Sequence, residues 1–389
     1  MVKKIQPTTF QRFFQTETVG ASILLFFAIA ALALANSPLA NVYEQLWQIP
    51  LTIGIVDHSL SLTLHQWIND ALMAAFFLLV GLEIKRELLV GELASVRKAA
   101  LPIAGAIGGM IVPAAIYWMF NGTGIGARGW GIPMATDIAF ALGALTLIAP
   151  RAPIGGKVFL TALAIVDDMG AVIVIALFYS DAIAWGALGG AAVLLLILIG
   201  FNATGVRRLW PYLFGGVVFW FFIHESGIHG TVAGVLLAFT MPMYASEGVT
   251  APILRLEHAL HNFSAFVVMP LFAFANAGVR ISGPVQYASI GFGVLAGLTI
   301  GKPLGITAAA FVAVKSGIAK LPDGISWRSL LGYAWLAGIG FTMSLFIAML
   351  AFGEGRPLNA AKLGTFAGSL LAGIIAAIIL KTTAREKSN

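Results

Sequence analysis

The sequence predicts an all-α membrane protein that forms one domain over residues 1–389 and crosses the bilayer twelve times. Only 10% of the residues are charged, 59% are hydrophobic, and the mean hydropathy is +0.93. A soluble domain has about 25% charged residues, so the charges here are too few to cover a surface in water. Cysteine is absent, which excludes a disulfide framework and a thiolate metal site.

Twelve apolar runs are candidates for spanning helices, each of which needs about 20 residues. They are 17–36, 67–84, 99–120, 130–150, 155–179, 182–201, 208–223, 227–244, 260–279, 288–314, 329–350 and 359–380. The first run imitates a signal peptide, but from Val19 to Ala35 it is longer than the usual apolar core of about 7–15 residues. We therefore interpret it as an uncleaved spanning helix.

The basic residues predict the orientation. An even number of spans puts both termini on one side of the membrane. With cytoplasmic termini, 18 of the 23 Lys and Arg residues fall in inside segments, 4 fall outside, and the last is Lys302 within a span. This distribution satisfies the positive-inside rule. It also explains the net charge of +6 without a nucleic-acid partner, because the basic residues are scattered among short loops.

One connection differs from the others. The stretch 49–66, IPLTIGIVDHSLSLTLHQ, alternates apolar and polar residues and is rich in β-branched types. This pattern predicts a small β-hairpin on the outer side. Because an exposed strand edge can pair with a copy of itself, the hairpin is a candidate contact for a homodimer.

Away from the span ends, four charged residues lie inside the predicted spans: Asp137, Asp167, Asp168 and Lys302. A lone charge at the bilayer centre costs at least about 2.5–3.5 kcal/mol, and such residues mark ion or proton paths. The alternative is a structural ion pair with the other carboxyl groups protonated. A structural role needs one partner per charge, and here three carboxylates meet one ammonium, so an ion path is favoured.

Helix-breaking residues accompany these charges. GIPMATDIAFALG contains Pro133, GKPLG contains Pro303 beside Lys302, and GIGFTMSLF contains two glycines. Broken helices at membrane depth are tolerated only where they line a cavity or are buried in protein. Three predicted breaks beside the charge set therefore favour a binding site.

A weak internal repeat supports the same site. Aligning 131–140 with 338–347 places Gly131 on Gly338 and Asp137 on Ser344. One interrupted span in each half is typical of transporters with inverted repeats. We expect spans 3–5 and 10–12 to be the repeats, with spans 4 and 11 discontinuous.

The motifs, taken in order, resemble those of the NhaA-type sodium/proton antiporters over nearly the whole chain. They are WINDALMAAFFLLVGLEIKREL, ATDIAFALG, ALAIVDDMGAVIVIALFY, RLEHALH, MPLFAFANAGV, GKPLGI and GIGFTMSLFIA. The resemblance implies a twelve-helix antiporter of the bacterial inner membrane that expels Na⁺ or Li⁺ and takes up protons electrogenically. It also implies a homodimer, and no cofactor is expected.

The resemblance implies roles for single residues. Asp167 and Asp168 match the paired ion-binding aspartates, and Lys302 matches the intramembrane lysine. Thr136 and Asp137 match the pair at the crossing of the broken helices. The remaining matches are an outer-side acidic residue, Asp70, and positions linked to pH response, which are Glu83, Glu87, Glu257, His258, His261 and His229. For the pH-linked positions, ordinary solvated charge, or a structural histidine at His229, is the alternative.

The two adjacent aspartates have different expected tasks. Neighbours on a helix point about 100° apart, so Asp167 and Asp168 cannot face the same way. We expect Asp168 to be the principal Na⁺ ligand, with Thr136 as a candidate ligand, and Asp167 to face Lys302 in one state and the ion or a proton in another. Lys302 has a second candidate role, which is to offset the negative ends of the broken helices.

Three other classes of function compete. An intramembrane aspartyl protease carries its aspartates on separate helices, whereas here they are adjacent. An ATP-driven pump needs a phosphate loop, but in GLTIGKPLG Ala296 replaces the first glycine and Pro303 replaces the Ser or Thr. A transporter of an organic solute is disfavoured because few aromatic or polar residues accompany the charge set.

Overall fold

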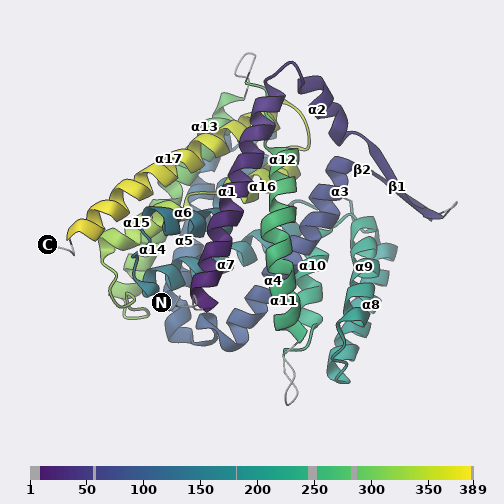
Figure 1. Cartoon of the computed structure of the whole chain (residues 1–389), viewed down its shortest axis with the longest axis horizontal. Helices are drawn as coiled ribbons and strands as arrows, with labels where there is room; N and C mark the ends of the chain where they lie inside the picture. The colour runs from purple at the N-terminus through teal and green to yellow at the C-terminus, as the bar shows by residue number, and fades with distance from the viewer. Residues whose placement is uncertain (1–8, 56–57, 181, 244–251, 282–286, 387–389) are drawn as a thin grey trace, which may run out of the picture.

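The computed structural model describes residues 9–55, 58–180, 182–243, 252–281 and 287–386, and nearly all of this part of the chain is helical (Figure 1). Eight described helices are long and apolar enough to cross a membrane. They are α1 (Thr9–Ala35), α3 with α4 (Leu64–Trp67, Met73–Val90), α5 (Val96–Asn121), α7 (Ile154–Phe178), α8 (Trp185–Ala203), α11 with α12 (Pro252–Phe263, Met269–Asn276), α13 with α14 (Ala288–Ala296, Lys302–Lys315) and α17 (Arg356–Glu386).

Two further spans are broken in the middle. The 3₁₀ helix Ile125–Met134 meets α6 (Ile138–Ile148) at 46°, and α15 (Trp327–Ala337) meets α16 (Phe341–Phe352) at 45°. These breaks fall in the two spans that the sequence predicts to be discontinuous. The break begins at Ala135 in the first of these spans and at Gly338 in the second. The alignment of Gly131 on Gly338 would place the first break at Gly131, so the observed break lies four residues later.

The third predicted break, at GKPLG, is absent. The helix runs from α13 to α14 through one π-helical turn, Gly297–Gly301. In this turn the Lys302 N–H donates to the Gly297 carbonyl. Pro303 then occupies the first turn of α14, where its missing N–H costs least. Similar π turns join α3 to α4 (Ile68–Leu72) and α11 to α12 (Ser264–Val268).

The count of spans reaches ten when each broken pair is one span, against the twelve predicted. The difference lies in α9 (Leu209–Glu225) and α10 (Thr231–Thr240), which have 17 and 10 residues. A helix of 10 residues is about 15 Å long, half of the hydrocarbon thickness. The twelve-span topology and its inverted repeats therefore stay predictions.

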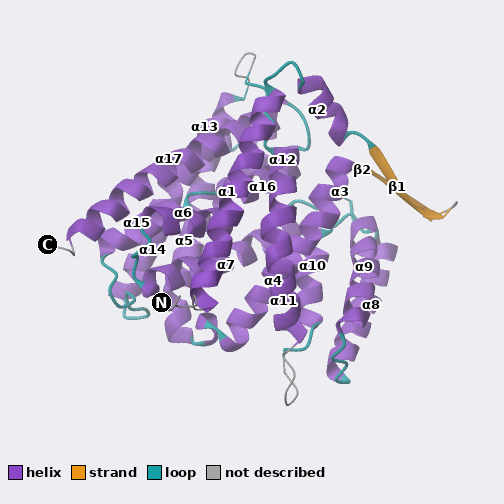
Figure 2. Ribbon diagram, in the orientation of Figure 1, coloured by secondary structure: helices purple, strands orange, loops and turns teal. Residues whose placement is uncertain are grey.

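Between α1 and α3 the chain forms α2 (Ala40–Trp47) and two strands that project from the body (Figure 2). β1 (Pro50–Ile55) pairs antiparallel with β2 (His58–Thr63), with Pro50 opposite Thr63. Thr63 then caps α3, because its side chain accepts from the Gln66 N–H while the Gln66 side chain accepts from the Thr63 N–H. The hairpin thus leads directly into the helix that carries Asp70.

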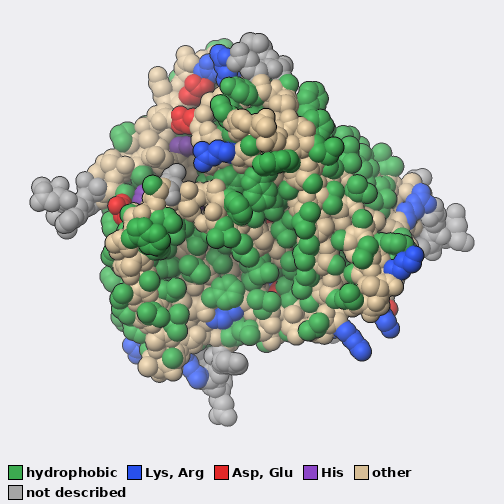
Figure 3. All heavy atoms as spheres, turned by 180° about the vertical axis from the view of Figure 1, so that it is seen from behind, with side chains coloured by type: hydrophobic (Ala, Val, Ile, Leu, Met, Phe, Trp, Pro, Cys, Tyr) green, Lys and Arg blue, Asp and Glu red, His purple; other side chains and the backbone are tan. Residues whose placement is uncertain are grey.

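The surface is apolar where a bilayer would contact it. Figure 3 shows hydrophobic side chains across the middle of one face, with the visible Lys and Arg mainly toward its upper and lower margins. Inside, one large buried cluster surrounds the broken spans, and a second joins α4, α8, α9, α10 and α11. The pair α8 and α9 stands at one edge of the molecule (Figure 1).

Small residues let the central helices approach closely. α14 packs along α5, and a methyl group on Gly108 would collide with the Gly305 carbonyl oxygen. Between α4 and α10, a methyl group on Gly234 would collide with the Ala74 carbonyl. Close backbone contact of this kind is the main source of helix association in lipid, where no hydrophobic drive exists.

We predict that Gly108→Ala lowers thermal stability by about 1–3 kcal/mol, the usual cost of overpacking. The matched control is Gly189→Ala on α8, where an added methyl group meets nothing within 4 Å. The control should be neutral or slightly stabilised, because Ala favours the helix over Gly. Thermal unfolding of the purified proteins in detergent measures both, and equal melting temperatures for the two variants would contradict the packing argument.

Candidate functional site

The candidate site lies where the two broken spans cross. The Asp137 N–H donates to the Ile339 carbonyl at 2.8 Å, and the Thr136 hydroxyl donates to the Ala337 carbonyl at 2.8 Å. The Ser344 hydroxyl donates to the Ile132 carbonyl, also at 2.8 Å. Unpaired backbone groups cost several kcal/mol in lipid, so each broken span supplies partners that the other one needs.

Asp137 caps two helices with one carboxylate. It is 1% exposed, and its Oδ1 accepts from the Phe140 N–H at 3.0 Å, in the first turn of α6. Its Oδ2 accepts from the Thr342 N–H at 3.1 Å and from the Thr342 hydroxyl, in the first turn of α16. A carboxylate is favoured at the positive end of a helix, and here it serves two such ends.

Lys302 occupies the opposite electrostatic position. Its side chain is fully buried, and Nζ lies 2.7 Å from Asp167 Oδ2. Nζ also donates to the carbonyl of Met134, the last residue of the first broken half. The two roles that the sequence left open, pairing with Asp167 and offsetting a helix C-terminus, are therefore geometrically compatible.

Asp168 is placed differently from Asp167. It is 2% exposed, and among the described residues none donates a hydrogen bond to its Oδ1 and no Lys or Arg forms an ion pair with it. Asp167 Oδ1 likewise meets no donor at full hydrogen-bond geometry in the described part of the chain, although Thr136 lies close to this carboxylate. Buried polar atoms are normally satisfied, so these oxygens are suited to bind a cation or a proton.

A small pocket approaches the charge set from one side. It has a volume of about 60 Å³, and Glu83, Arg86, His261 and Ile165 are among the residues that line it. Ile165 lies three residues before Asp168 on α7, so the two side chains share a helix face. The pocket thus extends from Glu83 to the face of α7 that carries Ile165, one helical turn from Asp168, and the aspartates themselves do not line it.

The residues matched to pH response on that side gather around Arg86. Its guanidinium pairs with Glu257 and, at 3.1 Å, with Glu87. His261 Nδ1 lies 4.0 Å from Glu83 Oε1. Sequence reasoning did not single out Arg86, although its place three residues after Glu83 and one before Glu87 was a usable signal.

His258 lies apart from these ion pairs. It is exposed, and its Nδ1 contacts the Leu254 carbonyl of its own helix at 2.7 Å. The structure therefore does not bring His258 into direct contact with the acidic residues of the cluster.

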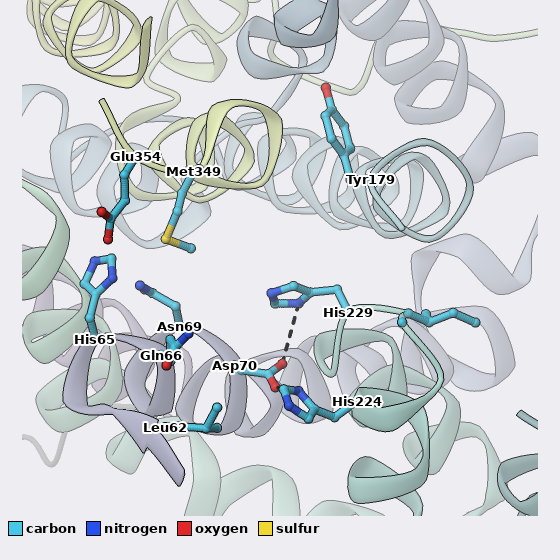
Figure 4. Close-up of a pocket in the computed structure, with 13 residues that line it drawn as sticks. Leu62, His65, Gln66, Asn69, Asp70, Tyr179, His224, His229, Met349 and Glu354 are labelled. Carbon is cyan, nitrogen blue, oxygen red and sulfur yellow. Dashed lines mark ion pairs between the residues drawn. The ribbon is translucent and has the colours of Figure 1, made fainter. Parts of the chain in front are cut away.

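Asp70 and His229 line a second pocket, of about 300 Å³ (Figure 4). Asp70 is 13 residues from Glu83, which corresponds to roughly 20 Å along the helix. The same pocket contains His224, which sequence reasoning missed and which contacts the Asp70 carboxylate at 2.5 Å. The missed signal was a histidine five residues before His229.

No resident metal site accompanies these groups: among the described residues, no three or more His, Cys, Asp or Glu side chains could hold a metal ion. The open oxygens are the aspartate pair itself, within a crossing of broken helices.

Comparison with known proteins agrees with this arrangement. The family model for Na⁺/H⁺ antiporter 1 matches residues 11–380. A Na⁺/H⁺ antiporter NhaA of Rhodospirillum rubrum is 49% identical, covering 96% of this chain and 97% of that protein. One of Escherichia coli is 47% identical, covering 94% and 95%. The chain belongs to the Na⁺/H⁺ antiporter 1 family.

This NhaA-type antiporter is a transporter of Na⁺ and H⁺ and not a catalytic enzyme, which decides against the protease. Its fold is also found at low identity. The sodium proton antiporter MjNhaP1 of Methanocaldococcus jannaschii, in a structure at pH 8, aligns with a TM-score of 0.50 over 96% of both chains, at 13% identity. That likeness concerns the fold alone.

We predict that Asp137→Ala lowers the free energy of unfolding by about 2 kcal/mol or more, because each N-cap contributes about 1 kcal/mol. The control is Ser326→Ala, which removes a single cap: Ser326 Oγ accepts from the Ser329 N–H of α15 at 3.2 Å. Thermal unfolding should show the larger loss for Asp137→Ala. An equal or smaller loss would mean that the Asp137 carboxylate does not stabilise both helix ends.

Proposed function

We propose that this protein is an electrogenic secondary antiporter that expels Na⁺ or Li⁺ and takes up two protons per ion, without ATP hydrolysis or a cofactor. Asp168 is the principal cation ligand, and Thr136 is a candidate further ligand. Asp167 exchanges between Lys302 and the transported ion or a proton. Alternating access through twelve spans with inverted repeats moves the loaded site between the two sides.

One observation carries this proposal. Two adjacent buried aspartates have opposite surroundings, since Asp167 pairs with Lys302 at 2.7 Å and Asp168 has no described cation partner. Na⁺ is a hard cation that takes oxygen ligands, and Asp168 Oδ1, which has no hydrogen-bond partner among the described residues, is open to it. Because both aspartates lie on consecutive residues, occupation of one changes the electrostatic potential at the other.

Charge counting supports the coupling. Three carboxylates and one ammonium give the charge set a net charge of −2 when all are ionised. One Na⁺ leaves it at −1, and two protons leave it neutral. A charge left in the membrane core is unfavourable, so an occupied site crosses more readily than an empty one. Na⁺ and protons compete for the same oxygens, and the pair titrates as a unit.

The setting of the protein is the bacterial inner membrane, with both termini in the cytoplasm. The excess of Lys and Arg in the predicted inside segments supports this orientation. On that side, the cluster of Glu83, Glu87 and Glu257 with His258 and His261 regulates the antiporter by pH, because histidine titrates in the physiological range. His229 takes part in the pH response near the outer end of the path. The β-hairpin within residues 49–66 joins two copies of the chain into a homodimer.

We predict that everted vesicles containing this protein, made from cells without their own antiporters, lose an imposed proton gradient when Na⁺ is added. Asp168→Asn should reduce this response to that of vesicles without the protein, because a neutral amide cannot exchange Na⁺ for a proton. Asp323→Asn makes the same chemical change on an exposed loop and should behave as the unchanged chain. Normal exchange by Asp168→Asn would overturn the site assignment.

We further predict that exchange responds to membrane potential. With two protons per Na⁺, one net charge moves per cycle, so a tenfold Na⁺ gradient balances a potential of about 59 mV at equal pH. Reconstituted proteoliposomes clamped with K⁺ and valinomycin measure the potential at which flux reverses. A reversal point that is independent of potential would show electroneutral exchange and refute the stoichiometry.

A further inference from the structure

Asp70 is held in an unusual place on its helix. It lies in the π turn between α3 and α4 and is 7% exposed. Its Oδ1 accepts from the Gly230 N–H at 3.0 Å, just before α10 begins. A methyl group on Gly230 would collide with Asp70 and Trp220, so this close approach requires glycine. The carboxylate is therefore fixed between α4 and the start of α10.

Two histidines flank this carboxylate, and they are not equivalent. His229 Nδ1 accepts from the Thr231 N–H at 3.4 Å, lies 3.0 Å from the Thr231 hydroxyl, and is 3.8 Å from Asp70 Oδ1. When the ring is neutral and this nitrogen accepts from the Thr231 N–H, it cannot also donate to Asp70. His224 Nδ1, in contrast, lies 2.5 Å from Asp70 Oδ2. Both histidines form ion pairs with Asp70, and the His224 contact is the shorter one; in Figure 4 the dashed line marks the longer pair with His229, and the His224 ring lies directly beside the carboxylate.

Aromatic packing favours the charged form of His224. Its ring stacks on Trp220 with centroids 5.7 Å apart, and Trp220 stacks on Trp67 with centroids 5.9 Å apart. An imidazolium over an indole face gains a cation–π interaction. His224 lies just beyond the predicted span 208–223, and its contact with the Asp70 carboxylate raises its pKa above the usual value.

The remaining ionisable groups of the pocket act at longer range. Glu225 follows His224 in the chain, and Glu354 lines the opposite wall of the pocket. His65 also lines the pocket, but its Nε2 contacts the Asn276 amide oxygen at 3.1 Å instead of a carboxylate. Lys362 is buried near His65 and Glu354. Of the two imidazoles paired with Asp70, His224 is thus the one in the shorter contact, and its protonation neutralises the carboxylate most directly.

We propose that Asp70 and His224 form a proton-binding site on the extracytoplasmic face, which makes Na⁺ release respond to external pH. The inference rests on the proposed function for its orientation and for the direction of Na⁺ movement. At low external pH the imidazolium neutralises Asp70, and the pocket does not hold back a departing Na⁺. As external pH rises, His224 loses its proton, the pocket gains one negative charge, and external Na⁺ is attracted back into the path.

The transport test measures how external Na⁺ inhibits exchange at external pH 6 and 8.5, with the internal solution constant. Inhibition should strengthen with pH in the unchanged chain, partly because fewer protons compete at the central site. In His224→Gln the pocket is always negative, so the pH-dependent change should be roughly fivefold smaller, in line with a partly screened charge a few ångströms away. His65 lines the same pocket but does not contact Asp70. The variant His65→Gln should therefore show the same pH-dependent change in Na⁺ inhibition as the unchanged chain.

A second measurement does not depend on transport. The chain has 6 histidines, so side-chain NMR of the labelled full-length protein in lipid nanodiscs can identify the His224 signal by its absence in His224→Gln. The titration midpoint of this signal should fall in Asp70→Asn, which keeps the shape of the side chain and removes its charge. Unchanged positions of the signals from the other histidines in the same spectra show that the variant is folded.

The outcomes separate the two levels of the argument. If the unchanged chain exchanges no Na⁺ for protons, the proposed function fails, and the NMR titration still tests the pair. If exchange occurs but His224→Gln keeps the full pH-dependent change in Na⁺ inhibition, the release site is refuted. A His224 midpoint that Asp70→Asn does not move would refute the proton-binding pair itself.

Discussion

The buried ion pair between Lys302 and Asp167 is the interaction on which the rest of the centre depends. It joins α14 to α7, and through the Met134 carbonyl it also holds the end of the first broken half-helix. Removing one member of such a pair leaves an uncompensated charge, which costs about 3–5 kcal/mol. The pair therefore ties these elements together, in addition to the exchange role that we propose for Asp167. A proton or Na⁺ that displaces Lys302 from Asp167 necessarily loosens the contact between three elements.

The position of Lys302 is prepared by the backbone around it. The π turn just before Lys302 carries Gly297 and Gly301, whose missing side chains leave room for Pro133 and Pro113. This close packing places α14 against the broken span, so that the lysine reaches Met134. A π turn also has one more residue than an α turn, which rotates the following side chains about the helix axis. The same device occurs at Asp70, and both π turns thus present a charged group to a neighbouring helix.

Much of the candidate site could be predicted because a charged residue inside a membrane span is so unfavourable that its presence indicates a function. Asp137, Asp167 and Lys302 were found in this way, and the breaks beside Asp137 and in GIGFTMSLF followed from proline and glycine. The residues that pair with these charges could not be predicted, because contacts between helices depend on their packing, and a local sequence pattern does not determine that packing. Sequence reasoning therefore placed a break at Pro303, where a π turn keeps the helix intact, and missed Arg86 and His224, which resemble ordinary charges near helix ends.

The helix α4 and its preceding π turn connect the two ends of this arrangement. Asp70 lies at one end and the cluster around Arg86 at the other, with the aspartates of α7 approached from the side of Glu83. α4 packs closely on α10, whose start holds Asp70 through the Gly230 N–H. A change of charge at either end therefore acts on the same closely packed pair of helices. Because a helix transmits displacement along its axis with little compression, the two proton-binding groups that we propose at its ends need no separate machinery to influence the proposed ion site.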